Sequence, residues 1–164
     1  MRKQTAFDRF CKQTHQGWFS IAVTMLRIGI GFVFLNAGLS KMKDWSAEEY
    51  LQGATGPLAE WFMSLAGNPL VDQLNIWGLT LIGLGLVLGI FVRPAAFFGI
   101  VVMVLYYLSD FEGNTAHGLI DEHVVYALIF AVFLSGGVGH VFGLDGLLSG
   151  RMRKQTWVTR VLFG

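Results

Sequence analysis

Long apolar runs separated by short polar stretches dominate the chain. A membrane-spanning helix needs about 20 consecutive apolar residues, because the hydrocarbon core of a bilayer is about 30 Å thick. The pattern predicts four such helices, at about residues 18–40, 70–92, 94–110 and 122–142. We therefore expect an all-α integral membrane protein, a four-helix bundle that forms one domain over residues 1–164.

The polar stretches predict how these helices connect. Residues 42–69 mix acidic and aromatic residues, which is typical of a short amphipathic cap lying at the membrane surface. Ser46 followed by Glu49 has the spacing of a capping box and predicts a short helix there. Arg93 and Pro94 predict a very short turn, so the second and third helices should pack antiparallel as a hairpin.

Charged residues divide between the two sides of the predicted bundle. Nine of the twelve Lys and Arg residues lie in the N-terminal lead, the turn at Arg93 and the C-terminal tail, and nine of the eleven acids lie on the opposite side. Cytoplasmic loops of membrane proteins carry the excess of Lys and Arg. We therefore expect a cell-membrane protein with both termini in the cytoplasm and the cap on the outer side.

Composition narrows the classes of function. Hydrophobic residues make up 54% of the chain and charged residues 14%, which favours contact with a lipid bilayer over a soluble fold. No basic patch with interleaved aromatic residues lies outside the termini, so nucleic acid is not an expected partner. Cys11 is the only cysteine, which excludes an internal disulfide and a CxxC pair. Any redox chemistry must therefore use a cofactor, a bound quinone or a partner protein.

Arg27 lies inside the first predicted span. If that span starts at Trp18, a rise of about 1.5 Å per residue places Arg27 about 14 Å into the membrane, near its centre. A charged side chain there costs at least about 3 kcal/mol unless it faces protein or water. At helical spacing one face of this helix collects Arg27, Gly31, Phe34, Gly38 and Lys41. The small residues on that face let another helix approach closely.

Two interpretations of Arg27 stay open. A guanidinium is planar, always charged and able to donate two hydrogen bonds at once, so Arg27 could bind an anionic or carbonyl-bearing ligand within the bundle. Alternatively, it snorkels or is capped by backbone carbonyls and polar side chains. The polar side chains considered for that role are Tyr106, Tyr107, Ser135 and Asn36. Lys41 continues the same face, although interfacial snorkelling is its simplest role.

A second polar group stands at the start of the fourth span. It comprises His117, Asp121, Glu122, His123 and Tyr126. The spacing matches no metal-binding pattern, and we predict no metal site. Because His titrates near neutral pH and carboxylates take up and release protons, His123 with Asp121 or Glu122 is a candidate proton-handling site. The alternative is a polar helix start, since acids are favourable at helix N-termini. Asp145 is assigned no role.

These residues resemble the DoxX/DoxD family of small four-helix membrane proteins. The resemblance rests on R-x3-G-x2-F-x3-G-x2-K, which reads here Arg27, Gly31, Phe34, Gly38 and Lys41. It is supported by the Gly-rich close of the second span up to Arg93, by Glu122-His-x2-Tyr126-Ala-Leu, and by Gly-Leu-Asp145-Gly-Leu-Leu. It covers most of the chain from Leu26 to Leu148.

The resemblance implies a function as well as a fold. DoxD-type members are similar to the membrane subunit of a thiosulfate:quinone oxidoreductase, and other DoxX-like members are associated with oxidative-stress complexes. Carried over, Arg27 and Lys41 would be the family's basic positions, suited to a quinone carbonyl or an oxyanion. The chain has no cysteine pair, haem motif or nucleotide fingerprint, so electron transfer would need a second protein subunit.

Our leading hypothesis from the sequence is a membrane subunit of a redox complex that binds quinone, with thiosulfate as the donor that the resemblance implies. Arg27, Lys41 and Tyr126 would bind the quinone, and His123 with Asp121 or Glu122 would move protons. The alternative is a non-enzymatic membrane anchor for a soluble redox or stress-response protein that docks on the cap. A solute or proton carrier is a weaker third class, because no internal repeat or paired half-helices are visible.

Overall fold

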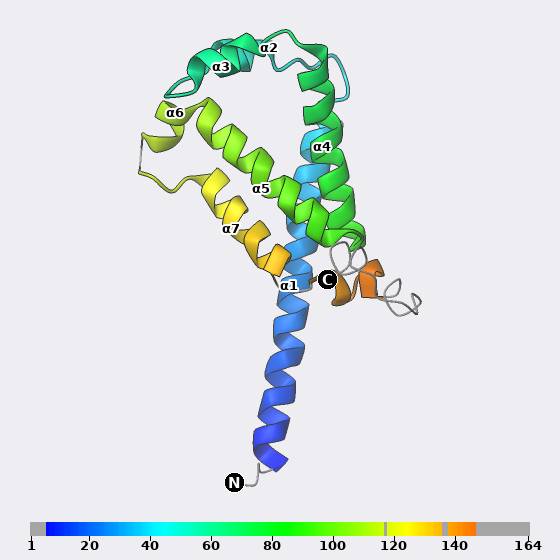
Figure 1. Ribbon diagram of the computed structural model, residues 1–164. Helices are drawn as coiled ribbons and strands as arrows, with labels where there is room; N and C mark the ends of the chain where they lie inside the picture. The colour runs from blue at the N-terminus through cyan, green and yellow to red at the C-terminus, as the bar shows by residue number, and fades with distance from the viewer. Residues whose placement is uncertain (1–5, 117, 136–137, 147–164) are drawn as a thin grey trace, which may run out of the picture.

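The computed structural model describes residues 6–116, 118–135 and 138–146 (Figure 1). Its long helices are α1 (Ala6–Ser40), α4 (Pro69–Leu88), α5 (Val92–Ser109) and α7 (Glu122–Ser135). The short helices are α2 (Glu48–Gln52), α3 (Ala59–Ser64), α6 (Phe111–Thr115) and the 3-10 turn η1 (Val138–His140). The all-α prediction is confirmed. The candidate residue His117 lies outside the described residues.

Among the described residues, three helical segments are long and apolar enough to cross a membrane: Gly17–Ser40 within α1, Pro69–Leu88 and Val92–Ser109. Together with the many large apolar side chains exposed on these helices, they make the chain a multi-pass membrane protein that contacts the lipid bilayer. The sidedness of the termini stays a prediction. We therefore name the two ends of the bundle by structure: the cap end is covered by α2 and α3, and the turn end holds the α4–α5 connection (Figure 1).

The helix α7 is shorter than the predicted span 122–142. It has 14 residues and ends at Ser135, so it is about 21 Å long, less than the roughly 30 Å of hydrocarbon in a bilayer. Two glycines follow it in the sequence, and glycine weakens a helix because its backbone loses the most freedom on folding. Beyond them the chain forms η1. A complete fourth crossing stays a prediction.

The turn between α4 and α5 lies earlier in the chain than predicted. The helix α4 ends at Leu88, and Gly89 adopts a left-handed conformation with φ 65°, which glycine tolerates without a steric cost. Arg93 and Pro94 belong to the first turn of α5, where the missing N–H of proline breaks no helical hydrogen bond. The two helices still form the expected hairpin (Figure 1).

The long helices form two closely packed pairs, α1 with α4 and α5 with α7 (Figure 1). Glycines lie at the contact within the first pair. A Cβ on Gly38 of α1 would meet Thr80 of α4, and a Cβ on Gly83 of α4 would meet the backbone of Leu35. The prediction that small residues on the Arg27 face admit a neighbouring helix is therefore confirmed.

Aromatic rings fill the space between the two pairs. Phe34 of α1 packs edge-on against Tyr126 and Phe130 of α7, with ring centroids 5.9 and 5.0 Å apart. Phe130 is fully buried and lies against Gly99 of α5, where a Cβ would be 2.6 Å from the ring. Because these rings are large, they hold the pairs apart. Toward the cap end the space between the pairs stays partly open.

The cap follows α1 and covers the end of the bundle (Figure 1). Its small apolar core consists of Ala47, Leu51, Ala54 and Phe62. The helix α2 begins at Glu48, and Ser46 Oγ accepts a hydrogen bond from the Glu48 N–H at 3.1 Å. The predicted short helix is therefore present, but its N-cap is Ala47 and not Ser46. Tyr50 is hydrogen-bonded to Ser109 at the end of α5 (2.9 Å), which ties the cap to the bundle.

The glycine contact between α1 and α4 predicts the effect of one added methyl group. Gly83→Ala should lower the free energy of unfolding by about 1–3 kcal/mol, because the new Cβ overlaps the Leu35 backbone. Gly78→Ala on the same helix is the matched control, since its Cβ would meet nothing within 4 Å. Thermal unfolding in detergent measures both. Equal melting temperatures for the two variants would contradict the close α1–α4 contact.

Candidate functional site

All four long helices border one small cavity at the cap end, which we call the four-helix cavity. Its volume is about 140 Å³. Its lining residues are Val33, Phe34, Ala37, Lys41, Leu79, Met103, Tyr106, His123 and Tyr126. An apolar cavity of roughly 150 Å³ can bind benzene, so this space suits a single six-membered ring. Three of the predicted site residues, Lys41, His123 and Tyr126, thus line the same cavity.

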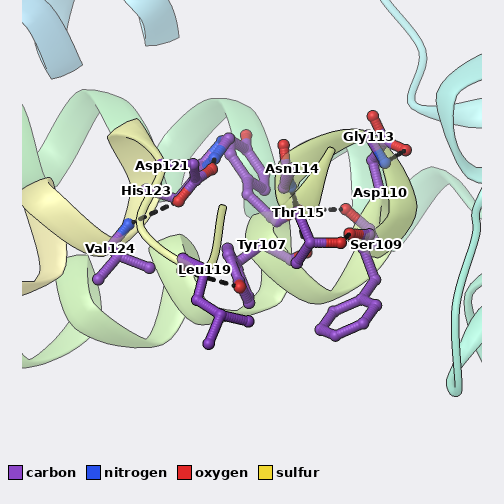
Figure 2. Close-up of polar contacts among 12 residues, drawn as sticks. Tyr107, Ser109, Asp110, Gly113, Asn114, Thr115, Leu119, Asp121, His123 and Val124 are labelled. Carbon is purple, nitrogen blue, oxygen red and sulfur yellow. Dashed lines mark hydrogen bonds and ion pairs between the residues drawn. The ribbon is translucent and has the colours of Figure 1, made fainter. Parts of the chain in front are cut away.

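Asp121 orients His123. One carboxylate oxygen of Asp121 lies 2.5 Å from His123 Nδ1, and the other accepts the Val124 N–H at 3.0 Å (Figure 2). Burial alone would raise the pKa of Asp121, but the hydrogen bonds from His123 and Val124 outweigh it and hold this pKa below its ordinary value. The carboxylate is therefore ionised at neutral pH and only accepts, so His123 Nδ1 carries the proton. In the neutral ring, Nε2 is then the basic nitrogen.

Lys41 brings a positive charge to the cap end of the cavity. Its ammonium lies 4.7 Å from the centre of the Trp45 ring, a cation–π contact with the cap. Burial lowers the pKa of Lys41, because a charged amine loses hydration there.

Glu122, the alternative proton carrier, is exposed at the start of α7 and does not line the cavity. In the described ranges 6–116, 118–135 and 138–146, no three His, Cys, Asp or Glu side chains gather as metal ligands would.

Tyr106 is a cavity residue that sequence reasoning did not place in this site. Its ring packs edge-on against His123, with centroids 5.9 Å apart. Its hydroxyl lies 2.7 Å from Nδ2 and 2.9 Å from Oδ1 of Asn75 on α4. A polar side chain in a membrane span needs a hydrogen-bond partner, so Asn75 is the residue in the sequence that could have indicated the Tyr106–Asn75 pair. Tyr50 of the cap lies beside Tyr106, with ring centroids 6.4 Å apart, so the cap reaches the edge of the cavity.

Arg27 does not belong to this group of residues, because it lies at the turn end. Its side chain is 1% exposed and donates hydrogen bonds to the carbonyls of Val138 (3.2 Å), Val141 (3.4 Å) and Phe142 (3.1 Å). A Cβ on Gly89 would touch the guanidinium, so Arg27 is level with the end of α4. The candidate membrane-spanning part of α1 is Gly17–Ser40, and α1 continues well beyond the other helices toward the N-terminus (Figure 1). The depth of Arg27 in the membrane therefore stays a prediction.

The geometry favours capping by backbone carbonyls over ligand binding at Arg27. The polar side chains considered as its partners bond elsewhere: Tyr107 donates to the Leu119 carbonyl at 3.0 Å, and Ser135 donates to the Val132 carbonyl at 3.1 Å (Figure 2 shows the first). The three carbonyl acceptors all follow α7 in the chain. Arg27 therefore fastens the segment after α7 to α1.

Asp145, to which we assigned no role, is 1% exposed and completes this arrangement. Its carboxylate accepts the N–H groups of Phe91 (2.8 Å) and Val92 (3.1 Å), which caps the start of α5 and suits the helix dipole. Its charge also attracts Arg27. We call these two side chains and their backbone partners the Arg27–Asp145 lock, because together they join α1, the α4–α5 turn and residues 138–146.

Comparison with known proteins identifies the family. A family model described as DoxX matches residues 22–110, more than half of the chain. The chain belongs to the DoxX family. The match covers the parts of α1, α4 and α5 that line the cavity, whereas the DoxX model stops before α7 and its His123. No curated protein and no solved structure matches the chain.

The Arg27–Asp145 lock predicts that the protein is less stable to unfolding when Arg27 is replaced. Arg27→Met should lower the free energy of unfolding by about 3–5 kcal/mol, because three carbonyls and a buried carboxylate lose their cationic partner. Lys43→Met, at an exposed position, is the control and should leave the melting temperature nearly unchanged. Thermal unfolding in detergent tests both. If the Arg27→Met protein is as stable as wild type, the structural role of Arg27 is contradicted and Arg27 is again a candidate ligand-binding residue.

The lowered pKa of Asp121 predicts how its contribution depends on pH. A carboxyl group with a depressed pKa stabilises the fold above its unfolded pKa of about 3.9 and stops doing so as the pH falls through its folded pKa. Asp121→Asn should therefore cost about 1 kcal/mol at pH 7, allowing for solvent screening, and progressively less in acid below about pH 4. Melting temperatures of both proteins across pH give the difference. A difference that grows in acid would contradict the assignment.

Proposed function

We propose that this DoxX protein is the membrane subunit of a redox complex and that its four-helix cavity binds the ring of a quinone. The observation that supports the proposal best is that Lys41, directly after α1, and His123 and Tyr126 of α7 line one cavity of ring size. Binding sites of this kind combine apolar walls with a few convergent polar groups. Membership of the DoxX family is consistent with this class of function.

The chemistry of the lining residues fits a quinone. A quinone presents two carbonyl oxygens, which accept hydrogen bonds, on an apolar ring. Lys41 carries an ammonium and Tyr126 a hydroxyl, and both can donate to such oxygens. Phe34, Leu79 and Met103 supply apolar wall. Because the cavity holds only one ring, the apolar tail of a membrane quinone would have to leave it, and Val33, which is 47% exposed on α1, borders an exit to the lipid.

His123 is suited to moving protons at this cavity. A bound quinone supplies the redox chemistry, since its reduction takes up two electrons and two protons. His123 Nε2 can take a proton or, when the ring is charged, give one to an oxygen in the cavity. The ionised Asp121 holds the ring in one orientation. Glu122, exposed beside this pair, can exchange protons with water.

The electrons must come from a second protein subunit, because the sequence has neither a cysteine pair nor a haem or nucleotide motif. Thiosulfate as their source rests on the resemblance to DoxD-type proteins. The cap is the surface that such a subunit would meet, and it presents exposed acids at Asp44, Glu48 and Glu49. The same surface would serve the alternative function, a membrane anchor for a soluble redox or stress-response protein.

Bound quinone is the direct test. The full chain is purified gently in detergent, and the quinone it retains is measured by mass spectrometry. His123→Ala and Lys41→Met should each reduce the retained quinone about tenfold or more, because each removes a hydrogen-bond partner worth roughly 1.5–3 kcal/mol. Lys43→Met is the matched control for Lys41, being an exposed lysine two residues away.

The controls separate the two functions. The control variant should keep the quinone that wild type carries. Wild-type protein that is folded but holds no quinone would contradict the proposal, as would equal amounts of quinone in wild type and His123→Ala. In that case, a soluble protein recovered in stoichiometric amount with the chain would favour the anchor function.

A further inference from the structure

The lipid-facing surface of α5 carries two apolar grooves, one on each side of a ridge. The α4–α5 groove has a volume of about 640 Å³, and the α5–α7 groove has a volume of about 490 Å³. Pro94 and Phe98 line both grooves. These two residues are four apart, so they lie one above the other on one helix face and form the ridge between the grooves.

The α4–α5 groove is long and apolar throughout. It runs from Leu74 near the cap end to Leu88 near the turn end, a rise of about 21 Å at 1.5 Å per residue. That length exceeds the roughly 15 Å depth of one leaflet of a bilayer. Gly78 leaves part of the groove open, because an added Cβ there would meet nothing within 4 Å. An apolar chain can therefore lie in this groove without displacing protein atoms.

Arg93 lies where the two grooves meet. It lines the α5–α7 groove and directly precedes Pro94, which belongs to both grooves. It also lies in the first turn of α5, where a candidate membrane-spanning segment begins. A guanidinium at this depth matches the level of lipid phosphates, and its planar fork suits a phosphate group.

We infer that this surface binds one anionic phospholipid, with an acyl chain in the α4–α5 groove and its phosphate at Arg93. A long apolar groove whose turn end lies beside a cation matches an amphiphile that has an apolar chain and a negative head. A partner helix is a poorer match, because a helix is about 10 Å wide and would have to rest on the ridge.

Lipid retention by the full-length protein tests the inference. The chain is purified into detergent micelles that hold equal amounts of phosphatidylglycerol and phosphatidylcholine, and bound lipids are counted by native mass spectrometry. Wild type should retain the anionic lipid preferentially. Arg93→Gln should reduce that preference roughly fivefold, the effect expected of one basic residue at a charged membrane surface. Lys43→Gln, an exposed basic residue at the cap end, should not.

A second pair of variants tests the grooves separately from the charge. Gly78→Leu puts a side chain into the α4–α5 groove, starting from a Cβ that would meet nothing within 4 Å, and should also lose the bound lipid. Gly29→Leu is the matched control, because its Cβ would likewise meet nothing within 4 Å and Gly29 lines neither groove. Loss in Gly78→Leu but not in Gly29→Leu supports the site. Three results overturn it: no preference in wild type, loss on Arg93→Gln alone, or a change of oligomeric state instead of lipid content in Gly78→Leu.

Discussion

The buried guanidinium of Arg27 is the interaction on which the arrangement of the helices depends. It donates to three backbone carbonyls that follow α7, while Asp145 from the same segment caps the start of α5. The α1–α4 and α5–α7 pairs are thereby joined at the turn end. Between the pairs, large aromatic rings such as Phe34 and Phe130 keep them apart. The ring-sized cavity lies beyond these rings, toward the cap end.

Arg27 within α1 and Lys41 directly after it have different roles. The buried Arg27 donates to backbone carbonyls, which suits a guanidinium because it stays charged and carries several donors. Lys41 lies two turns beyond Phe34, borders the cavity and contacts Trp45 of the cap. A ligand in the cavity would therefore meet the cation of Lys41 and the oriented His123 of α7.

The periodic part of the structure could be predicted from sequence. Runs of apolar residues located α4, α5 and the membrane-spanning part of α1, Gly17–Ser40, to within a few residues, but not the start of α1 at Ala6. The glycines on the Arg27 face indicated the close contact with α4. The partners of Arg27 could not be predicted, because they are backbone carbonyls more than 100 residues later in the chain. Asp145 was passed over for a similar reason, since its acceptor role depends on a turn geometry set by Gly89. Neither contact leaves a pattern in residue types.

The central claim is that the four-helix cavity, and not the Arg27–Asp145 lock, binds a quinone ring. A photoreactive quinone bound to the full chain in detergent, followed by irradiation and peptide mapping, tests it most directly. The account predicts crosslinks on Tyr106, His123 or Tyr126, at the cap end of α5 and α7, and their loss when excess unlabelled quinone competes. The account would be contradicted by crosslinks that unlabelled quinone removes but that are confined to residues 138–146 around Arg27.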